Sequence, residues 1–92
     1  MGSTLNKVVE ISVVHPFGLA VRFQDGAKGT HDCSAMVAET GPMIEPLHDP
    51  SFFAQVGLEY NAPTWPNGYD MCPDWLRMEM QIAGELQLSA AA

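Results

Sequence analysis

The most chemically capable stretch of the chain is TWPNGYDMCPDW, which runs from Thr64 to Trp75. Its Cys72 precedes Pro73, where we expect a helix to begin, and a thiol at a helix N-terminus can act as a nucleophile when its pKa is lowered. Such a thiol also needs a histidine base, and sequence spacing places none of the three histidines beside Cys72. The nearby acids, which would oppose a thiolate, are Glu59, Asp70, Asp74 and Glu79.

The same stretch can be explained by backbone conformation. Gly68 permits the positive φ of a turn, Pro66 restricts the chain before it, and Pro73 suits the first turn of a helix. Asp70 can accept backbone N–H bonds in such a turn. We therefore predict a turn followed by a helix start, with a thiol enzyme that uses Cys72 as the alternative.

Two other clusters contain the side chains of metal and acid–base sites. His31-Asp32-Cys33 and His48-Asp49 hold zinc-type ligands, but adjacent residues on a strand point to opposite faces, so His31 and Asp32 would not share an ion easily. Asp32 and Asp70 could form a catalytic carboxylate pair, yet each stands where a cap or turn acceptor is expected.

Walker-type, GxSxG and HExxH motifs are absent from the sequence. We predict a non-catalytic protein without a metal or other cofactor, and keep a carboxylate-dependent enzyme as an alternative.

Size and composition place the chain among small globular proteins. Its 92 residues fit one domain, residues 1–92, with a core over about 7–83 and a tail over about 84–92 that frays. No apolar run is long enough to cross a bilayer and no secretory signal precedes the first strand, so we expect a cytoplasmic protein that does not use a membrane. Cys33 and Cys72 lack CxxC spacing and are expected to be free thiols.

The charge balance bears on the kind of partner. Eleven acids and four bases give a formal net charge of −7, which would repel the phosphates of DNA or RNA. The charge is compatible with a basic protein partner, but acidity also serves solubility, and the sequence leaves both explanations open.

Alternating apolar residues predict an N-terminal antiparallel sheet of three strands. In KVVEISVVHP the inward positions are Val9, Ile11 and Val13, and in LAVRFQDG they are Leu19, Val21 and Phe23. Asp25-Gly26 predicts a type I′ turn into a third strand over AKGTHDC.

Helices and a small edge hairpin are expected to cover this sheet. The expected elements are a short helix in CSAMVAET capped by Asp32 or Ser34 and ended by Gly41-Pro42, a second helix capped by Asp49, a hairpin in GLEYNAPTWPNG, and an amphipathic helix from about Pro73 to about Leu86. On the last helix Arg77, Gln81 and Glu85 form a predicted solvent stripe, although Gly84 could end the helix early. We expect Trp65 in the core, and Trp75 either in the core or at an interface.

The order of these signals resembles a known family. The segments VVHP, LAVRFQDG, GTHD, PLHDPSFFAQV and TWPNGYDMCPDWL, which together span Lys7 to Leu76, are similar to the small bacterial proteins of domain-of-unknown-function family 2442. The resemblance implies an α+β domain with an N-terminal antiparallel sheet, and it implies no activity. Members are often encoded beside toxin-like or DNA-binding partners, so the resemblance implies a regulatory or antitoxin-like binding role.

These observations predict an α+β protein that acts by contacting another protein. The more specific hypothesis is an inhibitor that imitates nucleic acid and blocks a basic nucleic-acid-binding site, as an antitoxin or a phage inhibitor of a CRISPR effector subunit would. The alternative to an inhibitor is a homodimer without an inhibitory role. The sequence leaves open whether the protein is a monomer or a homodimer. The residues expected at the contact are Glu10, Glu45, Asp49, Glu59, Asp70, Asp74, Trp75 and Glu79.

Overall fold

Antiparallel strands pair early in the chain, and the helices follow them. The computed structural model describes residues 6–88. In chain order the elements are β1 (Val8–Val14), β2 (Gly18–Phe23), β3 (Lys28–Asp32), α1 (Ser34–Val37), the 3₁₀ helix η2 (Glu45–His48), α2 (Pro50–Phe53), β4 (Gly57–Glu59), β5 (Ala62–Thr64), α3 (Pro73–Ala83) and β6 (Leu86–Gln87).

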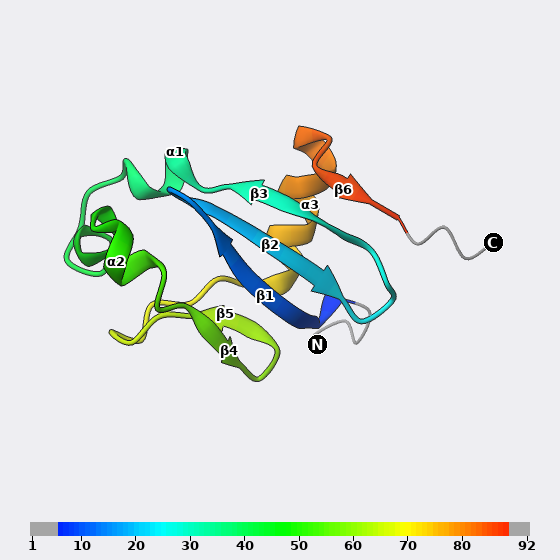
Figure 1. Cartoon of the computed structure of the whole chain (residues 1–92), viewed down its shortest axis with the longest axis horizontal. Coiled ribbons are helices and arrows are strands. Elements are labelled where there is room, and N and C mark those ends of the chain that lie inside the picture. Colours follow the sequence, from blue (N-terminus) through cyan, green and yellow to red (C-terminus); the bar gives the residue numbers. More distant parts are fainter. Residues whose placement is uncertain (1–5, 89–92) are drawn as a thin grey trace.

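The main sheet has the strand order β1-β2-β3-β6, and β4 and β5 form a separate hairpin. All pairings are antiparallel. In Figure 1, α3 crosses behind the sheet, α1 and α2 gather at one end of it, and the β4–β5 hairpin lies beside β1. The predicted α+β class, the three N-terminal strands, the small hairpin and the C-terminal helix are thus confirmed, and β6 is an additional strand.

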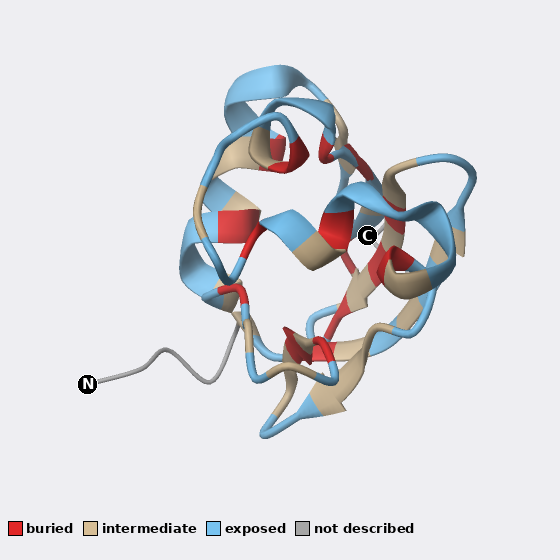
Figure 2. Ribbon diagram, turned by 90° about the vertical axis from the view of Figure 1, so that its left-hand side faces the viewer, coloured by how far each residue is buried: buried red, intermediate tan, exposed pale blue. Residues whose placement is uncertain are grey.

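The core lies between the inner face of the sheet and the elements that cover it. Leu19, Val21 and Phe23 of β2 are buried, as their alternation predicts. Trp65 is also buried, and its indole N–H donates to the carbonyl oxygen of Phe53 at 2.9 Å. Figure 2 shows the buried positions on the inward sides of strands and helices, with exposed positions outside.

The first strand departs from the predicted alternation at its start. The register shifts between Val8 and Glu10, and this irregularity leaves Val8 fully buried while Val9 is only half-buried. The prediction that Val9 points inward with Ile11 and Val13 was therefore wrong at its first residue, because a bulge inserts one residue into the pleat. Ile11 and Val13 pack against the core as expected.

The type I′ turn predicted at Asp25-Gly26 was also wrong. Gly26 has a φ of 94°, but Asp25 does not have a positive φ, and Phe23 N–H donates to Ala27 O across a three-residue loop. A tight two-residue turn with two positive φ values occurs instead at Tyr60 and Asn61, between β4 and β5.

Both short helices are shorter than expected, and only α2 has its predicted cap, since the N-cap residue of α1 is Cys33, which makes no side-chain cap bond. The Asp49 carboxylate accepts the Ser51 N–H at 2.9 Å, and α2 then ends at Phe53, before Val56 and Gly57. Asp32 accepts the Ser34 N–H at 2.9 Å, and α1 ends at Val37, well before Gly41-Pro42.

The C-terminal helix ends at Ala83 rather than Leu86, because Gly84 adopts a left-handed φ of 72° and reverses the chain. Leu86 and Gln87 then pair with β3 instead of fraying, while residues 89–92 of the predicted tail lie outside the described residues. The pairing needs Gly29 in β3, since a Cβ there would overlap the carbonyl oxygen of Glu85.

The predicted solvent stripe of α3 was wrong at two of its three positions. The Arg77 guanidinium lies 5.3 Å from the centre of the Phe23 ring and pairs with Asp25 at 3.0 Å. Glu85 bonds to His31. Among the described residues no helix combines the length and the apolar character that a membrane crossing requires.

Candidate functional site

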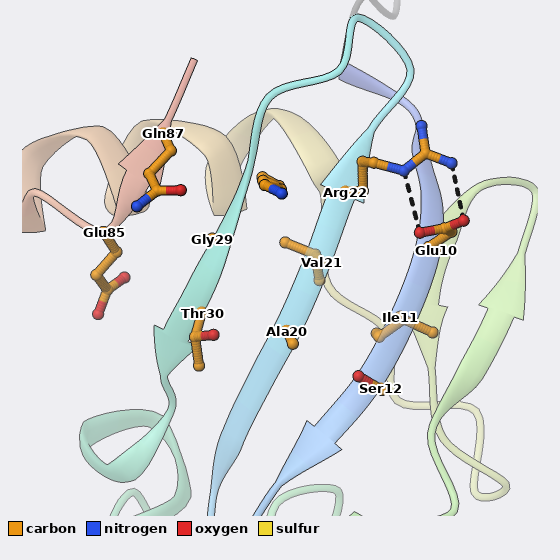
Figure 3. A pocket seen from close by; sticks show the side chains of 11 residues that line it. Glu10, Ile11, Ser12, Ala20, Val21, Arg22, Gly29, Thr30, Glu85 and Gln87 are labelled. Carbon is orange, nitrogen blue, oxygen red and sulfur yellow. Dashed lines mark hydrogen bonds and ion pairs between the residues drawn. The ribbon is translucent and has the colours of Figure 1, made fainter. Parts of the chain in front are cut away.

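One hollow lies on the outer face of the sheet, with a volume of about 890 Å³ (Figure 3). Its lining mixes charges of both signs, and the Arg22 guanidinium is bound by Glu10 at 2.8 Å. The hydrogen bond and charge of Arg22 hold the pKa of Glu10 below its ordinary value. These paired charges and small side chains such as Ser12 and Ala20 provide no reactive cluster.

A second hollow brings most of the reactive side chains together. Its volume is about 590 Å³, and it lies between α3 on one side and the end of β3 with α1 on the other. We call it the acidic cleft, because no Lys or Arg lines it and its lining includes five carboxylates. These are Asp32, Glu39, Asp70, Glu79 and Glu85.

The helical repeat of α3 supplies one wall of the acidic cleft. Trp75, Glu79 and Ile82 recur at spacings of four and three residues, so they share one side of the helix. Trp75 is 39% exposed and Ile82 is 75% exposed, whereas Leu76 and Met80 on the other side of α3 are fully buried. The cleft therefore presents apolar and acidic side chains side by side.

A buried histidine closes the inner end of the cleft. His31 is only 8% exposed, and its Nδ1 lies 2.7 Å from Oε1 of Glu85. The other oxygen of Glu85 accepts the backbone N–H of Asp32 at 3.1 Å. The His31 and Trp75 rings are nearly perpendicular, at 89°, with 6.2 Å between their centres. Glu85 thus orients the imidazole and joins the end of α3 to β3.

The exposed thiol of Cys72 lies in the same cleft as His31 and Asp70. It occupies the N-cap position of α3 without making a side-chain cap bond. Sequence spacing placed no histidine near Cys72, and in the fold His31, 41 residues earlier in the chain, lines the same cleft. The hydrogen bonds of residues 6–88 include none between this thiol and His31.

The second cysteine, Cys33, is buried. Burial, followed by the charges of Asp32 and Glu85, raises the pKa of Cys33 to about 12. Burial and the neighbouring charges of Glu39 and Asp70 likewise raise the pKa of Tyr69. Both shifts follow from a site that disfavours additional negative charge.

Asp32 accepts a backbone N–H bond just before α1 but does not occupy the N-cap position, which is Cys33, and the turn-acceptor role of Asp70 is not seen. Hydrogen bonds from Ser34 hold the pKa of Asp32 below its ordinary value. In the Pro66–Asp70 turn it is Asn67 that accepts a backbone bond, from Tyr69 N–H at 3.2 Å, while Asp70 is exposed. The Asp70 carboxylate therefore faces the cleft without a described hydrogen-bond partner.

The eight residues predicted at a partner contact do not form one surface. Asp70, Trp75 and Glu79 line the acidic cleft, and Glu59 lines a neighbouring hollow that also contains Asp70. The remaining four lie elsewhere: Glu10 pairs with Arg22, Asp49 caps α2, Asp74 accepts the Asn6 side chain at 2.7 Å, and Glu45 is exposed at the start of η2.

Sequence reasoning missed several cleft residues. Glu39 and Tyr69 carried no motif, and Glu85 was placed on a solvent stripe because its spacing from Arg77 suggested one. The residues described contain no group of three or more His, Cys, Asp or Glu side chains arranged to hold a metal ion.

The comparisons with known proteins identify a family and no function. A family model described as protein of unknown function (DUF2442) matches residues 8–80. No curated protein and no solved structure matches the chain.

Proposed function

Because the chain belongs to the family described as protein of unknown function (DUF2442), we propose its role from its surface: a non-catalytic binding module that takes a basic segment of a partner protein into the acidic cleft. The observation that carries this proposal is the lining of the cleft, which has five carboxylates and neither Lys nor Arg. A ligand that enters it meets negative charge from both walls.

Charge complementarity selects the sign of the partner. The formal net charge of −7 attracts a basic protein from a distance, and the cleft concentrates that charge at one place. Two of the four bases of the chain are already neutralised, since Arg22 pairs with Glu10 and Arg77 with Asp25. An incoming guanidinium therefore meets little competition from the protein's own cations.

The aromatic walls favour a cationic side chain over a simple ion. Trp75 lines the cleft and is partly exposed, and Tyr69 lines it as well. A guanidinium or ammonium group over such a ring gains about 0.5–1 kcal/mol at an exposed site, in addition to its pairing with carboxylates. The methylene stem of Arg or Lys would pack against Ile82 and Met36.

The narrower form of this proposal is an inhibitor of the antitoxin or phage anti-CRISPR type. In that form Asp70 and Glu79 take the place of phosphates and occupy a nucleic-acid site on the partner. It requires that nucleic acid and this protein exclude each other from the partner. A competition assay against the partner's own nucleic acid tests this requirement.

The test of the general proposal is a titration with a peptide of eight arginines, followed by NMR of the backbone amides. An equal peptide in which citrulline replaces every arginine keeps the shape and removes the charge. We expect shifts that map to the acidic cleft with the arginine peptide and none with the citrulline peptide. Shifts spread evenly over all acidic faces, or equal binding of both peptides, would contradict the proposal.

Matched variants separate the cleft from net charge. Glu79→Gln and Asp70→Asn each remove one charge from the cleft, and Glu45→Gln removes one from η2, outside it. We expect each cleft variant to weaken binding of the arginine peptide by about threefold, as for an exposed ion pair, and Glu45→Gln to have a smaller effect. Equal effects of all three would mean that only net charge matters.

Thiol chemistry at Cys72 is a second candidate, because Cys72 shares the cleft with a histidine whose Nδ1 is held by Glu85. A carboxylate that orients a histidine beside a nucleophile is the arrangement of a catalytic triad. The five cleft carboxylates disfavour both a thiolate and an anionic intermediate, so we rank this candidate second. An activated Cys72 would react with iodoacetamide near about pH 6, where an ordinary thiol is slow.

A further inference from the structure

His31 has one ring nitrogen that forms no bond within the described chain. Its Nδ1 lies 2.7 Å from Oε1 of Glu85, whereas Nε2 takes part in none of the hydrogen bonds of residues 6–88. Over the same residues no buried side-chain nitrogen or oxygen lacks a partner, so Nε2 must reach an accessible surface. The hollow that His31 lines is the acidic cleft. A residue that is only 8% exposed therefore opens to the cleft through Nε2.

Glu85 fixes the direction of the hydrogen bonds of this ring. A carboxylate oxygen accepts, so Nδ1 donates its proton to Glu85. The other oxygen of Glu85 accepts the backbone N–H of Asp32 at 3.1 Å, so both oxygens are engaged. In a neutral imidazole the single ring proton then lies on Nδ1, and Nε2 carries a lone pair. The cleft therefore has an uncharged hydrogen-bond acceptor at its inner end.

The rest of the lining suits two classes of organic cation. Carboxylates together with Trp75 and Tyr69 attract a primary ammonium or a guanidinium group, and they also attract a quaternary ammonium, which aromatic rings bind well. The two classes differ in hydrogen bonding, because Lys and Arg carry N–H donors and a quaternary ammonium carries none. The Trp75 ring centre lies 6.2 Å from that of His31, so the aromatic wall and the acceptor are neighbours.

We infer that His31 makes the acidic cleft selective for cations with N–H donors: the Lys or Arg side chain of the partner donates to Nε2 while cleft carboxylates balance its charge. This inference rests on the proposed function and deepens it, because it names the residue that reads the partner's side chain and the class of cation that is rejected. A quaternary ammonium leaves the lone pair of this nearly buried ring without a donor and excludes the water that would supply one.

The first experiment compares two peptides of equal length and equal charge on the wild-type protein. One has eight lysines, and the other has eight trimethyllysines, whose side chains carry no N–H. We expect the lysine peptide to bind about fivefold more tightly in calorimetry at about pH 8, where a histidine is ordinarily neutral. Equal or tighter binding of the trimethyllysine peptide would overturn the inference, because charge and aromatic contact alone would then account for binding.

Nitrogen NMR of the imidazole assigns this difference to His31. Long-range proton–nitrogen spectra distinguish a protonated ring nitrogen from an unprotonated one, and we expect a proton on Nδ1 and none on Nε2. The lysine peptide should shift the Nε2 resonance of His31, and the trimethyllysine peptide should leave it in place. If the arginine peptide shifts the cleft amides but the lysine peptide does not move Nε2, the inference is overturned and the proposed function stands. If no basic peptide binds, both are overturned.

Glu85→Gln and Glu79→Gln form a matched pair, since each removes one carboxylate from the lining of the cleft. In Glu85→Gln the amide oxygen can still accept the Asp32 N–H, and the amide NH₂ then donates to Nδ1, which moves the ring proton to Nε2 and removes the acceptor. Glu79→Gln leaves the ring as it is. Backbone amide spectra like that of the wild type show that both variants are folded.

The two variants should differ with the lysine peptide only. We expect Glu85→Gln to weaken its binding about tenfold and Glu79→Gln about threefold, while the trimethyllysine peptide loses about threefold in both. Equal losses of the lysine peptide, in a Glu85→Gln protein whose spectrum shows the proton on Nε2, would overturn the inference. The proposed function would then still stand on the loss that both variants share.

Discussion

His31 and Glu85 lie 54 positions apart in the chain, and their side chains meet at 2.7 Å between Nδ1 and Oε1. The second oxygen of Glu85 holds the backbone N–H of Asp32, so one carboxylate ties the chain after α3 to β3. The imidazole is almost fully buried and the Glu85 side chain is 20% exposed. This contact sets the inner end of the acidic cleft.

Replacing Glu85 should therefore destabilise the fold. Glu85→Ala leaves the buried His31 ring and the Asp32 N–H without their partner, and we expect a loss of about 2 kcal/mol in the free energy of unfolding. Urea denaturation measures the change. Glu79→Ala, which removes a carboxylate of the same cleft without a described hydrogen bond, is the control and should change stability by less than about 0.5 kcal/mol. Equal losses in the two variants would show that Glu85 has no special structural role.

The ion pair between Arg77 and Asp25 should make stability depend on acid pH. The Arg77 hydrogen bond, followed by the Ala27 N–H, holds the pKa of Asp25 below its ordinary value of 3.8. A carboxylate whose pKa is lower in the folded state stabilises above its unfolded pKa, and this stabilisation is lost as pH falls through the folded pKa. Asp25→Asn should thus be less stable than the wild type at neutral pH, and the difference should vanish well below about pH 4. Denaturation curves at several pH values measure it, and a constant difference would contradict the prediction.

Gly29 should tolerate no side chain, because a Cβ would overlap the Glu85 carbonyl oxygen and press on Met80. We expect Gly29→Ala to cost about 2 kcal/mol through displacement of β6 from β3. Gly57→Ala is the matched control, since a Cβ at Gly57 meets no atom within 4 Å. Denaturation midpoints that fall equally in both variants would show that the overlap at Gly29 has no cost of its own.

The two cysteines should differ sharply in reactivity. Cys33 is fully buried with a pKa raised to about 12, and Cys72 is exposed. Iodoacetamide at about pH 8 should therefore add one group to the native protein, at Cys72, and a second only after unfolding. Intact mass and peptide mapping report the sites. The native Cys72→Ser variant should remain unmodified, and rapid labelling of its Cys33 would contradict the burial of this thiol.

The raised pKa of Cys33 also bears on stability at alkaline pH. Its ordinary value is 9.0, so the unfolded state begins to lose this proton at a lower pH than the folded state does. The contribution of the neutral thiol is complete below the unfolded pKa and declines as pH rises towards the folded value. A Cys33→Ala variant should show a weaker decline of stability above about pH 9 than the wild type.

Local patterns in the sequence were sufficient for most of the secondary structure. Alternation in β2 placed Leu19, Val21 and Phe23 in the core, Asp49 marked the start of α2, and Pro73 marked the start of α3. These features depend on side chains and backbone within a few residues of each other, which is the range that a sequence pattern reports. The family was recognisable for the same reason, from short segments in a fixed order.

The acidic cleft was decided by tertiary structure. A bulge moved Val8 into the core, the absence of a side chain at Gly29 let the chain at Glu85 approach β3, and the packing brought His31 to Glu85, 54 positions later in the chain. Such contacts join residues that have no fixed spacing, and their formation depends on how whole elements pack. The sequence therefore determined which side chains were present and which elements carried them, while packing determined that Asp70, Trp75 and Glu79 share a cleft and that Glu10, Asp49 and Asp74 do not.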